Sequence, residues 1–267
     1  MNISPFTQND IYQINHLQPE GWSDIMVEFN NYLMFDFCRP IKVEHNNKII
    51  GIGNSILFKE SGWLSHIIVD VAFQGQGVGY SIVNYLMERL TLLGARSISL
   101  IATEIGEPLY KKAGFRWVSD YSYLSRIDKW IFRKVHENII PLTFSHYEDV
   151  FRLDRYISGE NREKLIRNYL ENGLVYQNNG VVEGYYLTNL GQGAIYATSI
   201  NAGIELLSLK YSLNDKAVLP SENENAIQFL KENGFEESKI QGKRMIYGEE
   251  LAWVANGVFS RIGGNYG

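Results

Sequence analysis

The chain has 267 residues, of which 45% are apolar and 21% are charged. This length is enough for one large domain or for two domains of common size. The formal net charge is −5, and no dense Lys/Arg run occurs. This disfavours a general nucleic-acid binder, which needs a basic surface to neutralise phosphates.

The single cysteine, Cys38, excludes an intramolecular disulfide and a cysteine-rich zinc site, and we expect no metal. No apolar run is long enough to cross a bilayer, so no membrane partner is expected. The first ten residues lack the basic and apolar regions of a secretory signal. These features predict a cytoplasmic protein.

The first half of the chain alternates strand and helix patterns around a glycine-rich loop. The clearest helix follows the loop, because Ile82, Leu86 and Leu90 form one apolar stripe that stops at Gly94. A further helix is expected after Ser23, a good N-cap residue. Strands are predicted at 3–6, 41–44, 48–58, 63–73, 97–102 and 117–127, and a short helix at 108–113.

This order breaks between residues 132 and 143, where Pro141 lies. We therefore predict two domains, at residues 1–130 and 143–267. In the second half, helices are predicted at 162–170, 203–211 and 224–233, and strands at 180–188, 194–200, 217–219 and 243–247.

An internal repeat relates the two halves. A shift of 120 residues places Leu109–Phe115 on Phe229–Phe235, and both segments end in Gly-Phe. The strands that precede these two segments, at 97–102 and about 217–221, also align under this shift. The second copy has no counterpart of the glycine-rich loop.

The loop itself, residues 74–79, lies between a buried strand and an amphipathic helix. Its glycines let the backbone approach a ligand closely, and the helix start offers amide donors with partial positive charge. This pattern suits a pyrophosphate. Tyr80 and Ser81 exclude a P-loop, which requires Lys there, and Tyr80 also replaces the third glycine of a dinucleotide fingerprint. A tight strand-to-helix turn without a ligand is the alternative.

The loop resembles motif A of the GNAT superfamily of N-acetyltransferases, which reads Gln/Arg-x-x-Gly-x-Gly/Ala after a central strand. Gln74, Gly77 and Gly79 fill its three fixed places. The Tyr-x-x-x-Gly-Phe pattern of the family follows one helix and one strand later, from Tyr110 to Phe115. The resemblance implies an α/β (α+β) fold with a mixed sheet, whose central strands splay apart to hold acetyl-CoA.

The resemblance also assigns residues to the cofactor. In the family, the backbone of the strand here written Ile67, Ile68 and Val69 pairs with the pantetheine arm. Many members have an asparagine seven residues before the tyrosine, where this chain has Thr103. The cofactor-binding residues of the loop are then Gln74, Gly75, Gln76, Gly77, Val78, Gly79 and Tyr80.

Other segments are similar to a bacterial GNAT subgroup with a second, acetyltransferase-like domain. These segments include Glu20–Ser23, Trp63, and Ala102–Tyr110 in the first half. In the second half they include Pro220, Asn223, Ala226, Gly234-Phe235 and Arg244-Met245. The resemblance therefore implies a degenerate GNAT-like C-terminal domain without the CoA loop. There Leu230 replaces the tyrosine.

The implied reaction is direct attack of an amine on the thioester of acetyl-CoA, in a ternary complex. Tyr110 is the candidate acid for the departing thiolate, and a backbone amide near Val69 is the candidate donor to the oxyanion. Tyr110 as a packing residue is the alternative. The base is left open between His66, Asp70, Glu104 and water. Strict alternation places His66 and Asp70 on one face of their strand, unless a bulge intervenes.

For the acceptor, the sequence indicates only a primary amine of a small molecule or peptide. Trp22, Tyr32, Phe35 and Trp63 are apolar enough to line a pocket, although such residues usually lie in a core. A non-catalytic acyl-CoA sensor and an interaction module are the alternative functions. A homodimer is one option for the oligomeric state, which the sequence leaves open.

Overall fold

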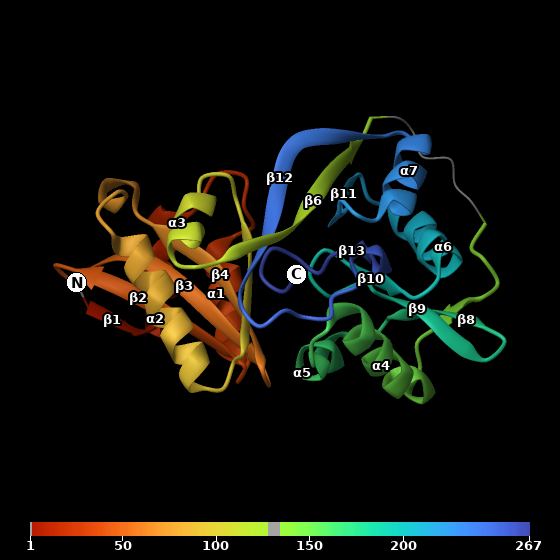
Figure 1. Cartoon of the computed structure of the whole chain (residues 1–267), viewed down its shortest axis with the longest axis horizontal. Coiled ribbons are helices and arrows are strands. Elements are labelled where there is room, and N and C mark those ends of the chain that lie inside the picture. The colour runs from red at the N-terminus through yellow and green to blue at the C-terminus, as the bar shows by residue number, and fades with distance from the viewer. Residues whose placement is uncertain (1, 128–133) are drawn as a thin grey trace. The chain divides into compact units, whose positions relative to one another are not determined.

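The computed structural model describes residues 2–127 and 134–267 and divides into two compact units (Figure 1). The first unit comprises the chain up to Arg116 together with Met245–Glu249 and Tyr266. The second comprises Trp117–Arg244, Glu250–Asn265 and Gly267. These limits differ from the predicted domains 1–130 and 143–267, which stay a prediction, since residue 130 lies outside the described residues.

The first unit is built on a mixed sheet. Its strands are β1 (Asn2–Pro5), β2 (Cys38–His45), β3 (Lys48–Phe58), β4 (Ser61–Val69) and β5 (Ser97–Ala102). They lie in this order, antiparallel from β1 to β4 and parallel between β4 and β5. Strand β12 (Phe235–Gly248) lies next to β5, and its residues from Met245 onward belong to this unit. The predicted mixed sheet is confirmed.

The helical segments of this unit are η1 (Gln8–Leu17), α1 (Ile25–Met34), η2 (Val71–Phe73), α2 (Val78–Leu92) and α3 (Glu107–Lys112). Helix α2 packs on β3 and β4. A Cβ on Gly53 would lie 2.8 Å from the Ile82 side chain, so the glycine lets the helix approach the sheet. The predicted strand 63–73 ends earlier, at Val69, because Asp70 accepts a hydrogen bond from the Ala72 amide and starts η2.

Helix α1 begins one residue later than predicted. Asp24, and not Ser23, is the N-cap, since its Oδ1 accepts from the amides of Met26 (2.8 Å) and Val27 (3.4 Å). Both residue types cap helices well, so the geometry decides between them. Helix α1 carries Tyr32, which is buried at 1% exposure.

Removing this cap tests its contribution to stability. Asp24→Ala is expected to lower the free energy of unfolding by about 1 kcal/mol, because two amides of α1 lose their acceptor. Asp24→Asn keeps an acceptor oxygen and is expected to retain most of that stability. Urea unfolding followed by circular dichroism measures both variants. An alanine variant as stable as the wild type would show that Asp24 does not cap the helix in solution.

The second unit contains a five-stranded sheet in the order β13-β10-β9-β8-β7, and β11 pairs separately with β6. Its strands are β6 (Arg116–Arg126), β7 (Ile139–Pro141), β8 (Leu174–Asn178), β9 (Val181–Leu187), β10 (Ala194–Ala197), β11 (Lys216–Pro220) and β13 (Val258–Ser260). Its helical segments are η3 (Phe144–His146), α4 (Tyr147–Ser158), α5 (Glu163–Ile166), η4 (Arg167–Tyr169), α6 (Ile200–Tyr211), α7 (Glu224–Glu232) and η5 (Ala255–Gly257). Helices α4 and α6 both pack on β9 and β10 and lie on either side of them in Figure 1.

A buried ionic network holds α4 against this sheet. Asp154 of α4 forms an ion pair of 2.5 Å with Arg162, and it accepts a hydrogen bond of 2.7 Å from the Tyr185 hydroxyl. The side chains of Asp154 and Arg162 are each 1% exposed. Buried charges are tolerated when they are paired and hydrogen-bonded, so this network is structural.

Candidate functional site

The central strands of the first unit separate along their length. Strands β4 and β5, both described throughout, pair only at Ser61–Ser97, Gly62–Ile98 and Trp63–Ser99. Beyond these pairs β4 runs on to Val69 and β5 to Ala102 without pairing to each other. This separation, called the notch below, leaves the backbone of β4 at Ile67–Val69 unpaired with β5. The predicted splay of the central strands is confirmed.

A bulge changes the side-chain alternation of β4 at this point. Ser65 pairs with Asn54 and Ile68 with Ile52, so His66 and Ile67 share the place opposite Gly53. His66 takes a φ of +48°, a left-handed conformation that is uncommon outside glycine. Because of this bulge, the strict alternation expected from the sequence does not hold here. The bulge includes Ile67, the first residue of the segment Ile67–Val69.

The glycine-rich loop connects the end of β4 to α2. Gly75 (φ +72°) and Gly77 (φ +86°) adopt left-handed conformations, and a Cβ on either would meet no atom within 4 Å. The Gln74 side-chain amide donates to the Val69 carbonyl (3.1 Å), and that of Gln76 donates to the Ala72 carbonyl (2.9 Å). The two glutamines thus brace the loop, while the glycines leave open space over its backbone.

Three segments meet at the start of α2. The helix begins at Val78 after Gly77 as N-cap, so its first amides have no acceptor within the helix. A Cβ on Gly79 would lie 3.4 Å from the Leu109 side chain of α3 and 3.6 Å from the Val69 side chain of β4. The Lys112 ammonium lies 4.8 Å from the centre of the Tyr80 ring. The helix dipole and Lys112 both favour an anion here.

Tyr110 of α3 packs beside this junction. A Cβ on Gly106 would lie 3.0 Å from the Tyr110 ring, and Phe115 meets the ring edge-on at 6.0 Å between centroids. Burial raises the pKa of the Tyr110 hydroxyl to about 12, so it stays protonated at neutral pH. Within the described part of the chain, the hydroxyl has no hydrogen-bond partner. It is therefore available as a donor to a ligand.

Thr103, the residue in the place of the family's asparagine, is exposed after β5. Its hydroxyl accepts a hydrogen bond of 3.2 Å from the Gly106 amide, and its carbonyl accepts from the amides of Gly106 and Glu107. Thr103 therefore shapes the turn that leads into α3. Its contact with a cofactor stays a prediction.

The three candidate bases differ in their surroundings. His66 shares a hydrogen bond of 2.6 Å with the Tyr32 hydroxyl, and burial lowers the pKa of its imidazole to about 4, which leaves it neutral. Asp70 accepts a hydrogen bond of 2.7 Å from Lys48, which lowers the pKa of its carboxyl. Glu104 is exposed in the turn before α3. The Asp70 carboxylate thus already accepts hydrogen bonds from Lys48 and from the Ala72 amide, where η2 starts.

The four aromatic candidates separate into two groups. Trp63 is fully buried, and Phe35 stacks on Phe37 at 4.9 Å, so both belong to packing. Trp22 and Tyr32 lie around His66, at 5.7 and 5.6 Å between ring centroids. The sequence pattern alone did not predict this grouping, because it joins residues far apart in the chain.

Among the described residues of the second unit, a strand pairs with β10 along the edge that is open on β4 in the first unit. Strand β13 pairs with β10 and contacts β11, and Asn223 donates to the Val258 carbonyl of β13 (3.1 Å). At the start of α6, the N-cap Ser199 donates to the Glu183 carboxylate (2.6 Å). A strand occupies the place beside β10, and an acidic side chain lies at the helix start, where an anion would be repelled.

This arrangement predicts one acetyl-CoA site per chain, in the first unit. Titration calorimetry is expected to give a stoichiometry of one. The Glu183→Gln variant removes the negative charge at α6 and is expected to keep that stoichiometry, because β13 still occupies the place beside β10. Two equivalent sites in the wild-type chain would contradict the prediction.

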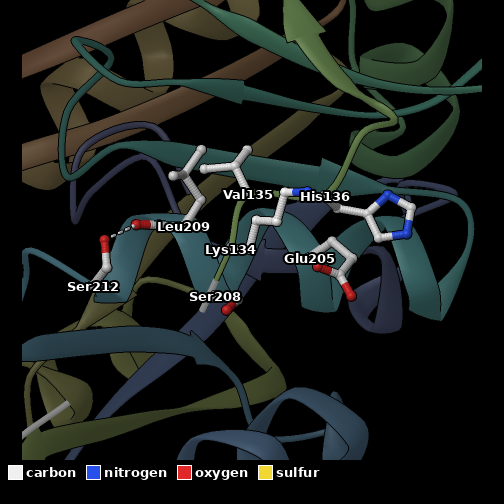
Figure 2. A pocket seen from close by; sticks show the side chains of 7 residues that line it. All are labelled: Lys134, Val135, His136, Glu205, Ser208, Leu209 and Ser212. Carbon is white, nitrogen blue, oxygen red and sulfur yellow. Dashed lines mark hydrogen bonds between the residues drawn. The ribbon is translucent and has the colours of Figure 1, made fainter. Parts of the chain in front are cut away.

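Other parts of the described chain show no second site of this kind. A hollow in the second unit lies between Lys134–His136 and residues of α6 such as Glu205 (Figure 2). No group of three or more metal-binding side chains occurs among residues 2–127 and 134–267. In the same residues, no helix has the length and apolar character needed to span a membrane.

Comparisons with known proteins agree with this geometry. Residues 38–117 match the family described as acetyltransferase (GNAT) domain. The structure of a proposed acetyltransferase from Pyrococcus horikoshii is similar over 100% of this chain and 95% of its own, with 19% identity and a TM-score of 0.85. A tandem GNAT protein of the clavulanic acid biosynthesis pathway is similar over 92% of this chain and 98% of its own, with 12% identity and a TM-score of 0.64. No curated protein matches the sequence.

Within the first unit, residues 38–117 therefore match a family whose members transfer acyl groups from acyl-CoA. Over 92% of its length, the chain has the fold of a tandem GNAT protein. The predicted fold class and the predicted resemblance are confirmed.

Proposed function

We propose that the chain transfers the acetyl group of acetyl-CoA to a primary amine of a small molecule or peptide, by direct attack in a ternary complex. The observation that carries the proposal is the meeting of the free β4 edge, the open glycine loop and the unpartnered Tyr110 hydroxyl. In this proposal the backbone of Ile67–Val69 binds the pantetheine arm, and the loop amides hold the pyrophosphate. Thr103 lines the same opening.

The chemistry requires three groups. The neutral amine attacks the thioester carbon, so that a C–N bond forms and the C–S bond breaks. A backbone amide of β4 near Val69 donates to the oxyanion of the tetrahedral intermediate. Tyr110 donates its proton to the departing thiolate.

A covalent acetyl-cysteine route finds no support in the first unit. Cys38 is buried, and burial raises the pKa of its thiol to about 12. A cysteine reacts as its thiolate, so this thiol is a poor nucleophile. Direct attack by the acceptor is the simpler reaction for this site.

The experiment that tests the proposal measures thiol release. The purified chain, acetyl-CoA and a panel of primary amines are combined, and free CoA is detected with a thiol-reactive dye. Amine-dependent release supports acetyl transfer. Acetyl-CoA binding without release for any amine would instead favour the acyl-CoA sensor. A cytoplasmic location and a homodimer stay predictions beside this proposal.

A further inference from the structure

Helix α1 is joined to β4 beside the notch. The hydrogen bond between Tyr32 and His66 connects α1 to the bulge of β4. Phe29, one turn earlier on α1, also packs against the His66 ring, at 6.3 Å between centroids. Helix α1 is therefore held over the strand residues that directly precede the notch.

An accessible tryptophan, Trp22, lies beside this contact. Trp22 meets the His66 ring edge-on at 5.7 Å and keeps 44% of its surface exposed, whereas Phe29 and Tyr32 are buried. The Gln18 side chain holds the Trp22 segment, since it donates to the Trp22 carbonyl (3.2 Å) and accepts from the Ile25 amide (2.9 Å). Trp22 thus offers a fixed apolar surface to a molecule arriving from solvent.

The Glu28 carboxylate of α1 has no counterion among the described residues. Glu28 lies four residues before Tyr32, on the same side of α1. Its side chain is half-buried and makes no hydrogen bond or ion pair with any residue among 2–127 and 134–267. Burial raises the pKa of its carboxyl. A partly desolvated carboxylate without a partner is stabilised by an arriving cation.

We propose that Glu28 binds the ammonium group of the acceptor and takes its proton, and that the acceptor is a primary amine whose apolar or aromatic body lies on Trp22. This inference rests on the proposed function and names its substrate class. Trp22 supplies apolar contact and attracts a cation through its ring face.

The proton balance follows from these positions. Glu28 receives one proton from the ammonium, and the neutral amine forms the C–N bond of the tetrahedral intermediate, whose C–S bond then breaks. Tyr110 gives its proton to the CoA thiolate and regains one from the nitrogen of the tetrahedral intermediate. Glu28 then releases its proton to solvent, so the products are the amide, CoA and one proton.

Binding to the chain saturated with CoA tests this inference without turnover. The probes are 2-phenylethylamine, its uncharged analogue 2-phenylethanol, and glucosamine. We expect 2-phenylethylamine to bind most tightly, and Glu28→Gln to weaken it roughly ten- to hundredfold while leaving 2-phenylethanol unchanged. Trp22→Ala is expected to weaken both phenyl compounds. Glu20→Gln, at an exposed position before α1, is the matched control.

Two results would overturn the inference. One is an unchanged ratio of amine to alcohol affinity in Glu28→Gln; the other is glucosamine binding as tightly as 2-phenylethylamine in the wild-type chain. Each can occur while thiol release still proceeds with some amine, in which case the proposed function stands. The absence of thiol release with every amine would instead contradict the proposed function.

Discussion

Gly77→Glu is expected to lower the affinity for acetyl-CoA roughly a hundredfold in titration calorimetry. Gly77 caps α2 with a φ of +86°, and no atom lies within 4 Å of the position where a Cβ would stand. A glutamate there would place a side chain and a negative charge at the helix start, where the pyrophosphate is proposed to bind. Charge repulsion at about 4 Å costs ~1 to 4 kcal/mol, depending on solvent access, which is the origin of the expected loss.

Two further variants separate charge from backbone strain. Gly180→Glu introduces the same side chain at a φ of +81°, also in open space, but in a turn of the second unit. It is expected to share the strain of a non-glycine residue at positive φ and to bind acetyl-CoA normally. Gly77→Asn tolerates the left-handed conformation without adding charge, and is expected to lose less affinity than the glutamate variant. Wild-type affinity in Gly77→Glu would exclude this loop as the pyrophosphate site.

The features of the first unit that could be predicted from the sequence are local. The glycine loop, the helix stripe of Ile82, Leu86 and Leu90, and the Tyr110–Phe115 motif each lie within a short segment. Their spacing reports the turn, the buried face and the helix end directly. The splayed strands followed from the family resemblance, and the pairing of β4 with β5 confirms them.

The features that escaped prediction depend on contacts between distant residues. The end of β12 joins the first unit, although more than a hundred residues separate it from β5. Strand β13 has three residues, too few for a periodic pattern, and is held by Asn223. The contact of Tyr32 with His66 requires both the bulge and the position of α1. None of these has a signature in a short window of sequence.

Glu28 illustrates the same limit for the candidate site. On the sequence it is an ordinary acidic residue of an amphipathic helix, where a charged side chain normally faces water. Only the structure shows that its carboxylate is half-buried and without a partner among the described residues. His66, a strand histidine in the sequence, is a buried neutral ring at a bulge.

Tyr110→Phe is expected to lower kcat about a hundredfold while changing the affinity for acetyl-CoA little. General acid catalysis contributes about 10²–10⁴-fold, and the thiolate is a good leaving group, which favours the lower end of that range. Burial raises the pKa of the hydroxyl to about 12, so the donor is protonated at neutral pH. The ring contacts with Gly106 and Phe115 do not involve the hydroxyl and are expected to survive.

The measurement is single-turnover acetyl transfer, which reports the chemical step, combined with calorimetry for acetyl-CoA. Tyr85→Phe is the matched control, because Tyr85 packs against the same core as Tyr110 but lies on α2, where its hydroxyl accepts from Arg89. A loss of kcat at unchanged acetyl-CoA affinity indicates an interaction made mainly in the transition state. If the Tyr110 variant transfers at the wild-type single-turnover rate, the residue serves packing only, and water or another donor protonates the thiolate.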